Sequence, residues 1–218
     1  MTKVIIFGTK DTAQLANYYL NKHNSLYEVV CFTINKQFIT HDKFCDKPVI
    51  AFEDIENIFS PKEYKMFAPM TGVKMNNVRE NIYKQGKQKG YEFISYVSPQ
   101  CTNFSNKIGE NCFILEDNTI QPFVEIGNNV ILWSGNHIGH HSIIKDNVFF
   151  TSHIVLSGHC NVEENSWIGV NSTIRDYTKI AKYSLIAMGS LITKSTEEYG
   201  FYMGTPAKKQ EKNSLEIY

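Results

Sequence analysis

The strongest constraint on this chain is a six-residue repeat of large apolar residues in its second half. Fifteen aliphatic or aromatic side chains, here called the anchors, recur at every sixth position without a skip. They are Ile108, Ile114, Ile120, Ile126, Leu132, Ile138, Ile144, Phe150, Leu156, Val162, Ile168, Ile174, Ile180, Ile186 and Ile192. A hexapeptide period is typical of a β-helix, in which each repeat supplies one short strand and one turn.

The position four residues after each anchor is filled mostly by small or β-branched side chains. These residues are Cys112, Asn118, Val124, Val130, Asn136, Ser142, Val148, Ile154, Cys160, Ser166, Ser172, Thr178, Ser184 and Ser190. A narrow coil requires this pairing, because one large side chain fills the axis while a small one fits beside it. Both positions are therefore predicted to point inward.

A second period, of eighteen residues, is superimposed on the first. Asparagine stands three residues after an anchor at Asn111, Asn129, Asn147 and Asn165. Because asparagine tolerates the positive φ of sharp turns, these residues predict one corner repeated from coil to coil. Three repeats then form one triangular coil, and the fifteen anchors predict five coils stacked about 4.8 Å apart.

The first hundred residues follow a different pattern, in which strand-like runs alternate with helix-like runs. Strands are expected at 3–7, 28–33, 48–52, 64–69 and 92–97, and helices at 13–21, 52–59 and 77–90. Such alternation is typical of a small parallel α/β sheet. We therefore predict an α/β domain over residues 1–100 and a β-helix over residues 101–218, with the joint at 98–107.

Composition argues against several classes of partner. The formal net charge of the 218 residues is zero, which predicts no general attraction to nucleic acid or to an anionic membrane. No apolar stretch approaches the length of a membrane span, and the apolar run at the start is too short for a signal peptide. The five cysteines form no close pair, so a reducing, cytoplasmic location is expected.

Ligands of a parallel α/β sheet bind at the carboxyl ends of its strands. In this chain those ends are the loops after Phe7, Thr33 and Pro69. The first loop, Gly8–Thr12, lacks the G-x-G-x-x-G pattern, which argues against NAD. Asp11 or Thr12 either caps the following helix or, in addition, helps it to hold a phosphate or ribose group.

Five of the seven histidines fall between residues 137 and 159. His140 and His141 are predicted at one corner, and His159 at the same corner one coil further on, so His141 and His159 are expected to stack about 5 Å apart. Three further side chains are expected on the outer surface nearby, namely Phe149, His153 and Trp167. Imidazole suits proton transfer near neutral pH; the alternative is a set of exposed turn histidines with no role.

The segment Gly135–Ile174 resembles the hexapeptide-repeat sugar acyltransferases, with the sequence GNHIGHHSIIKDNVFFTSHIVLSGHCNVEENSWIGVNSTI. The acetyltransferases of nucleotide-linked 4-amino sugars and the related sialic acid O-acetyltransferases are the most similar groups. Gly204–Lys208 is similar to the closing G-x-P-A-K of that family, and the strand–Gly–loop–helix start is similar to its sugar-nucleotide domain. The resemblance implies a left-handed β-helix, a homotrimer, and acetyl-CoA in the groove between neighbouring coils.

The resemblance also implies roles for single residues. His140 matches the catalytic base, and Gly158 lies near the thioester of acetyl-CoA, where its N–H can stabilise an oxyanion. Val170 and Met188 match positions that line the pantetheine arm. The positions that match substrate-binding residues are Lys10, Asp11, Thr12, Asn35, Thr71 and His141. Acetyl-CoA is the expected co-substrate, and no metal is expected.

Two departures from the family pattern bear on the chemistry. The family follows its catalytic histidine with Asp or Glu, whereas this chain has His141, and a charged imidazole there would lower the basicity of His140. Either another carboxylate serves or the acceptor needs less help, and an amine needs less than a hydroxyl. The glycine-rich first loop of the family is replaced here by GTKDTA, so the sugar nucleotide or its mode of binding can differ.

The sequence therefore predicts an acetyl-CoA-dependent N-acetyltransferase. Its substrate would be the amino group of a nucleotide-linked sugar used in surface glycans such as the O-antigen of lipopolysaccharide. A sugar O-acetyltransferase is the close alternative. A zinc hydratase of the γ-carbonic anhydrase type is less favoured, because no two histidines of the cluster are five residues apart. A non-catalytic sugar-nucleotide-binding protein is the remaining alternative.

Overall fold

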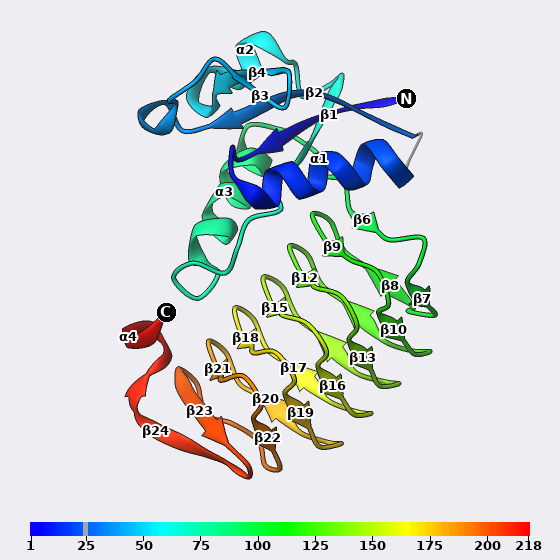
Figure 1. Ribbon diagram of the computed structural model, residues 1–218, viewed down its shortest axis with the longest axis vertical. Helices are drawn as coiled ribbons and strands as arrows, with labels where there is room; N and C mark the ends of the chain where they lie inside the picture. The colour runs from blue at the N-terminus through cyan, green and yellow to red at the C-terminus, as the bar shows by residue number, and fades with distance from the viewer. Residues whose placement is uncertain (24–25) are drawn as a thin grey trace.

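The computed structural model describes residues 1–23 and 26–218, and it divides into an α/β domain and a stack of coils (Figure 1). The domain contains a sheet of order β3-β4-β2-β1-β5. Its strands are β1 (Thr2–Phe7), β2 (Tyr27–Ile34), β3 (Lys43–Phe44), β4 (Lys47–Ala51) and β5 (Tyr64–Phe67). Its helices are α1 (Asp11–His23), α2 (Ile55–Ile58) and α3 (Asn77–Gln88), with 3-10 turns at Lys36–Phe38 and Phe52–Asp54.

The sheet is mixed, whereas the sequence predicted a parallel one. Four strands pair in parallel, but β3 pairs antiparallel with β4. The turn between them places Cys45 and Asp46 at φ 48° and 61°, the positive values that a two-residue hairpin turn requires. Neither residue is glycine or asparagine, so the sequence contains no strong signal for this hairpin.

The two faces of the sheet are covered by different helices. Alternate residues of β1 point to opposite faces, so Val4 packs with Leu20 of α1 while Ile5 packs with Ile82 of α3. Helix α1 lies between the sheet and the coils (Figure 1), and its buried side also contributes to the core that joins the two parts. The α/β domain is thereby fixed against one side of the coil stack.

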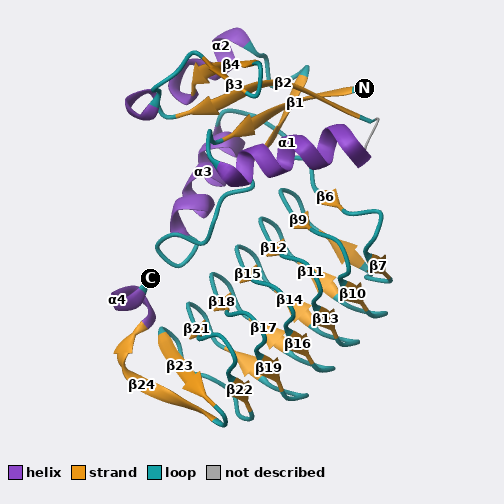
Figure 2. Ribbon diagram, in the orientation of Figure 1, coloured by secondary structure: helices purple, strands orange, loops and turns teal. Residues whose placement is uncertain are grey.

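The coils have three faces, each a sheet of two-residue strands (Figure 2). The covered face, which packs on the α/β domain, comprises β6 (Tyr96–Val97), β9 (Phe113–Ile114), β12 (Ile131–Leu132), β15 (Phe149–Phe150), β18 (Trp167–Ile168) and β21 (Leu185–Ile186). The second face comprises β7 (Thr102–Asn103), β10 (Thr119–Ile120), β13 (His137–Ile138), β16 (Val155–Leu156), β19 (Thr173–Ile174) and β22 (Leu191–Ile192). The third face comprises β8 (Lys107–Ile108), β11 (Glu125–Ile126), β14 (Ile143–Ile144), β17 (Asn161–Val162) and β20 (Lys179–Ile180).

The six-residue register is confirmed throughout the coils. The anchors from Ile114 to Ile192 are buried, and Ile108 at the start of the series is partly buried against the same core. The small residues four positions later are also buried, from Cys112 to Ser190. Strands eighteen residues apart pair in parallel, as in Ile126 with Ile144, so each side chain lies over its counterpart in the next coil.

The coils begin earlier than the sequence predicted. Val97 pairs in register with Ile114 and Asn103 with Ile120, so these two residues hold the positions of anchors. The step from Asn103 to Ile108 is five residues rather than six, and the period is lost there. The expected strand at 92–97 is accordingly divided. Phe93 bridges to Met66 of the α/β domain, while Tyr96–Val97 joins the coils.

Three columns of corner residues with positive φ connect the faces. Corner 1 lies between the third and covered faces and contains Asn111, Asn129, Asn147 and Asn165. Corner 2 lies between the covered and second faces and contains Asp117, Gly135, His153, Asn171 and Gly189. Corner 3 lies between the second and third faces and contains Phe123, His141, His159 and Tyr177.

The asparagines of corner 1 form a buried column of side-chain hydrogen bonds. Asn111 donates to Asn129 (2.7 Å), Asn129 to Asn147 (2.8 Å) and Asn147 to Asn165 (3.3 Å). The column ends on the α/β domain, because Asn165 donates to the carboxylate of Glu80 at 2.8 Å. The asparagines of corner 1 therefore form the predicted turns and, in addition, connect the coils to the α/β domain.

Arg79 of α3 makes a further link between the two parts. Its side chain is buried, and its guanidinium donates to the carbonyl oxygens of Met70 (3.1 Å) and Asn147 (2.8 Å). It also lies over the ring of Phe149, 5.5 Å from the centroid. Burial lowers the pKa of Arg79, and the carbonyl oxygens supply the acceptors that a buried cation needs.

The chain ends in a hairpin beyond the last coil. Strand β23 (Gly200–Gly204) pairs in parallel with β21 and antiparallel with β24 (Ala207–Asn213), and Gly204–Lys208 spans the turn. Helix α4 (Ser214–Ile217) follows, and Tyr218 contacts Trp167 with ring centroids 5.0 Å apart. Within the described residues no helix is long and apolar enough to cross a membrane.

The register predicts that the same substitution, to aspartate, has a large effect on stability at an inward position and a small effect at a neighbouring outward position. Leu156 is fully buried in the coil axis and Thr173 faces outward on the adjacent strand. Leu156→Asp should lower the free energy of unfolding by at least about 3 kcal/mol, because it buries an unpaired carboxylate. Thr173→Asp should change it by about 0.5 kcal/mol or less. Chemical denaturation measures both, and equal stabilities would contradict the register.

Candidate active site

Corner 3 is a column of four planar rings. The rings of Phe123 and His141 are 4.6 Å apart, those of His141 and His159 are 4.8 Å apart, and those of His159 and Tyr177 are 4.7 Å apart. The imidazoles of His141 and His159 are inclined by only 11°, which confirms the predicted stacking. All four residues have positive φ, between 54° and 66°, a conformation that is uncommon outside glycine and asparagine.

His140 stands beside this column and contacts both histidines. Its Nδ1 lies 3.0 Å from Nδ1 of His141, so one of the two imidazoles donates a hydrogen bond to the other. Its ring is perpendicular to that of His159, with centroids 5.1 Å apart. Its backbone N–H donates to the side-chain oxygen of Gln121 at 2.9 Å. His140 is thus oriented from two sides while its ring stays exposed.

Gly158 faces His140 from the next coil. A methyl group on Gly158 would lie 2.9 Å from Cε1, 3.0 Å from Nε2 and 3.3 Å from Nδ1 of His140, so the Cε1–Nε2 side of the imidazole is the part nearest to this glycine. Among the described residues no atom accepts a hydrogen bond from the N–H of Gly158. A free backbone donor and a ring nitrogen are therefore placed side by side, as the oxyanion stabiliser and base of an acyl transfer would be.

Val170 and Met188 lie one above the other beside corner 2. The N–H of Gly189 donates to the oxygen of Val170 at 2.8 Å, which joins the two coils. Both side chains are apolar and exposed, Val170 by 38% and Met188 by 76%. The second face separates them from His140 at corner 3 of the same chain.

The predicted substrate residues of the α/β domain gather at the carboxyl edge of its sheet. Lys10 precedes α1, and Asp11 and Thr12 begin it. The N–H of Gly8 donates to the oxygen of Thr33 at 2.8 Å, which holds the loops after β1 and β2 together. Asn35 follows β2 and donates to Glu53 at 3.4 Å, and Thr71 is exposed in the loop after β5.

Two hollows lie beside these loops, and of their lining residues only Asn35 was identified from the sequence. One, of about 260 Å³, lies between Thr9 and the segment that includes His41 and Lys43. The other, of about 470 Å³, is lined by amide side chains, namely Asn35, Gln37, Asn77, Asn81 and Gln85. The only signal in the sequence was the spacing of the α3 amides at every fourth residue, which places them on one helix face.

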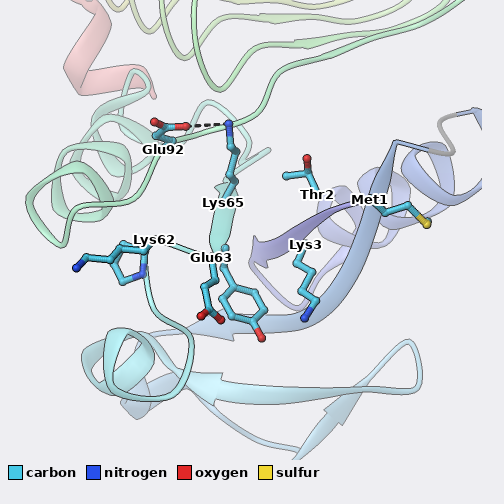
Figure 3. A pocket seen from close by; sticks show the side chains of 9 residues that line it. Met1, Thr2, Lys3, Lys62, Glu63, Lys65 and Glu92 are labelled. Atoms are coloured by element: carbon cyan, nitrogen blue, oxygen red, sulfur yellow. Dashed lines mark ion pairs between the residues drawn. The ribbon is translucent and has the colours of Figure 1, made fainter.

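A third hollow, of about 580 Å³, lies at the opposite edge of the sheet, near the start of β1 and of β5 (Figure 3). Lysines 3, 62 and 65 contribute to its lining, and Lys65 pairs with Glu92 at 2.8 Å. Ligands of such sheets bind at the carboxyl ends of the strands, so we assign this hollow no part in the site.

Three side chains were wrongly expected beside the histidine cluster. Phe149 and Trp167 belong to the covered face, where they pack against the core shared with the α/β domain. His153 lies at corner 2. The six-residue period correctly places all three side chains outside the coil, but it does not say which outward face another domain covers.

Comparison with known proteins gives three findings. The family model described as bacterial transferase hexapeptide (six repeats) matches residues 107–140. The acyl-[acyl-carrier-protein]--UDP-N-acetylglucosamine O-acyltransferase of Sinorhizobium fredii (strain NBRC 101917 / NGR234) is 29% identical over 106 residues, which are 45% of this chain and 39% of that protein. The chain thus spans about two-fifths of the length of the curated relatives it matches.

Solved structures match almost the whole chain. The acetyltransferase domain of PglB from Neisseria gonorrhoeae FA1090 has a TM-score of 0.85 and 19% identity, and the match covers 96% of this chain and 100% of that one. A perosamine N-acetyltransferase from Caulobacter crescentus, solved with CoA and GDP-perosamine, has a TM-score of 0.84 and 14% identity over 96% and 97% of the two chains. The common fold is an N-terminal α/β domain followed by a left-handed β-helix.

These findings confirm the resemblance drawn from the sequence. Residues 107–140 carry the repeat of the hexapeptide-repeat transferases, and the structural neighbours of the chain include N-acetyltransferases of nucleotide-linked sugars.

The contact between Gly158 and His140 gives a test of this site. Gly158 does not have a positive φ, so its backbone accepts alanine, but the new methyl group would displace the imidazole of His140. Gly158→Ala should reduce kcat for acetyl transfer from acetyl-CoA by roughly 10²-fold, because a displacement of about 1 Å can cost that much.

Thermal unfolding of Gly158→Ala should stay close to that of the wild type. Ser157→Ala is the matched control, because the Ser157 hydroxyl has no hydrogen-bond partner among the described residues and Ser142 donates to the backbone oxygen of Ser157, which alanine keeps. Full activity in Gly158→Ala, or an equal loss in Ser157→Ala, would contradict the assigned geometry.

Proposed function

We propose that the protein is an acetyl-CoA-dependent N-acetyltransferase of a nucleotide-linked amino sugar. The observation that carries this proposal is that Gly158, whose N–H has no acceptor among the described residues, lies against the imidazole of His140. The first group is suited to a thioester oxygen that becomes negative, and the second to a nitrogen that must lose a proton. Structural neighbours that bind CoA and GDP-perosamine support the same class of substrates.

The proposed reaction uses both Gly158 N–H and the imidazole of His140. The amine nitrogen of the sugar attacks the carbonyl carbon of acetyl-CoA, and the oxyanion that forms accepts a hydrogen bond from Gly158 N–H. His140 takes a proton from the attacking nitrogen. The C–S bond then breaks, the amide forms, and the thiolate of CoA leaves as the thiol after receiving that proton. No other reactant is consumed.

His141 supports His140 in place of the acid that the family pattern has. When Nδ1–H of His140 donates to Nδ1 of His141, 3.0 Å away, the lone pair of His140 is on Nε2, the ring nitrogen nearer to Gly158. A neutral imidazole fixes this tautomer but does not stabilise the charged base as a carboxylate does. In the described part of the chain none of the three histidines forms a salt bridge.

This weaker support favours an amine over a hydroxyl as the acceptor. An amine is a good nucleophile once it is neutral, and it loses its proton as the bond to carbon forms. A sugar hydroxyl needs a stronger base before it attacks. O-acetylation therefore stays the second candidate, and the surface glycan that would receive the sugar, such as an O-antigen, is part of the proposal.

The α/β domain is proposed to hold the nucleotide. Its loops Lys10–Thr12 and Asn35 lie at the carboxyl edge of the sheet. The neighbouring Thr9 lines a hollow with His41 and Lys43, and Asn35 lines a hollow with other amides. Cationic side chains and the start of α1 suit the phosphates, and amide groups suit the donors and acceptors of a base or sugar.

A homotrimer is part of the proposal because one chain does not bring these groups together. The α/β domain packs on the covered face, whereas His140 lies at corner 3, the edge between the other two faces. Val170 and Met188 lie beside corner 2. We propose that corner 3 of one copy faces corner 2 and the nucleotide loops of the next copy, so that the acetyl-CoA groove lies between copies.

Cellular location follows from the same substrates. Nucleotide sugars and acetyl-CoA are cytoplasmic metabolites, and the five free cysteines agree with a reducing compartment. We therefore propose a cytoplasmic enzyme.

Thiol release from acetyl-CoA tests the function directly. The wild type should release CoA thiol with one of a panel of UDP-, GDP- and dTDP-linked amino sugars, and product mass should increase by one acetyl group. His140→Ala should lower kcat by about 10²-fold or more, the contribution of a general base, while the size of the assembly stays unchanged. Wild-type turnover in His140→Ala would refute the base, and turnover only with hydroxyl acceptors would favour O-acetylation.

A further inference from the structure

We propose that the three imidazoles of His140, His141 and His159 bind one Zn²⁺ ion reversibly, and that this ion switches off acetyl transfer. The binding claim stands on the histidine cluster alone. The inhibition claim rests on the proposed function, because it requires His140 to be the base.

The spacing of the ring nitrogens suits a single zinc ion. One nitrogen from each of the three imidazoles can be chosen so that all lie within 4.8 Å of one another, and Nδ1 of His140 is 3.0 Å from Nδ1 of His141. Bonds of about 2.0–2.1 Å in a tetrahedral site place ligand nitrogens roughly 3.4 Å apart. Rotation of exposed rings on a fixed backbone closes the remaining difference.

The backbone of the coils fixes the Cα positions of the three histidines. His141 and His159 occupy equivalent corner positions eighteen residues apart, with φ of 58° and 57°. The N–H of His159 donates to the oxygen of His140 at 2.9 Å, which ties the second coil to the first. Only side-chain rotation is then needed for binding, so little ordering cost opposes the metal.

The donor set selects the kind of metal. Three neutral imidazoles without a carboxylate suit zinc and its neighbours in the first transition series, and they do not suit Mg²⁺ or Ca²⁺, which prefer oxygen ligands. All three side chains are exposed, so the fourth position of the ion stays open to water. An exposed site with an open position is expected to exchange its metal, in contrast to a closed structural site.

Metal binding and catalysis compete for the same lone pairs. A ring nitrogen of His140 that is bound to zinc cannot take a proton from the sugar amine. If His140 or His141 binds the ion through Nδ1, the hydrogen bond between the two rings is also lost, because that nitrogen is the one that takes part in it. Free zinc should therefore act as an inhibitor that chelators reverse.

The binding test uses calorimetric titration of the 218-residue chain with ZnCl₂. We expect one ion per chain for the wild type and at least tenfold weaker binding for His159→Asn, since even changes outside the ligand set cost 10–100-fold in affinity. His153→Asn is the matched control, because His153 at corner 2 has a φ of 58°, against 57° for His159, and is also exposed. Asparagine tolerates that conformation in both variants.

His153→Asn should bind zinc as the wild type does, and MgCl₂ should give no binding heat with any of the three proteins. Equal zinc affinity of the wild type and His159→Asn would overturn the proposed site. So would an equal loss in His153→Asn.

An activity measurement tests zinc inhibition separately from the proposed function. Zinc should inhibit acetyl transfer by the wild type, EDTA should restore it, and His159→Asn should resist the same zinc concentration. If no acetyl transfer is found with any acceptor, the proposed function fails while the calorimetric result still decides the metal site. If zinc binds with the expected pattern but transfer continues at saturation, the inhibition claim is refuted.

Discussion

The packing of large anchors along the coil axis is the constraint on which the rest of the structure depends. Because each anchor must fill the axis, the chain advances by one full turn every eighteen residues, and each residue lies over the one eighteen positions away. This register stacks His141 on His159, sets Gly158 against His140, and joins the asparagines of corner 1 into a buried column. A shift by one residue would reverse inward and outward side chains and remove all three arrangements.

Most of the coil geometry could be predicted from the sequence because the anchors recur at every sixth residue. A six-residue period states which side chains point inward, so the buried positions and the corner of His140 were predictable. It does not state which outward face a second domain covers, and for that reason Phe149 and Trp167 were misplaced near the histidines. It also fails where the period slips, as between Asn103 and Ile108, so the strand at Thr102–Asn103 was missed and Tyr96–Val97 was assigned to the α/β domain.

The substrate end of the site was less predictable. Lys10, Asn35 and Thr71 were expected at the carboxyl edge because the ends of the strands could be predicted from the sequence. His41, Lys43 and the amides of α3 line hollows there, but they come from three separate segments that no local motif connects. The repeat pattern also did not predict that the proposed site is divided between two copies. That division depends on which face of the coils the α/β domain covers.

The central claim is that His140 of one copy acts on a sugar nucleotide held by another copy, and mixed assemblies test it most directly. His140→Ala removes the base, and Asn81→Trp fills the amide-lined hollow. Each variant alone should be inactive. Random trimers formed by unfolding and refolding an equal mixture should regain about one quarter of wild-type acetyl transfer, since a site is whole when two intact halves meet. No recovery in confirmed mixed trimers would contradict a shared site.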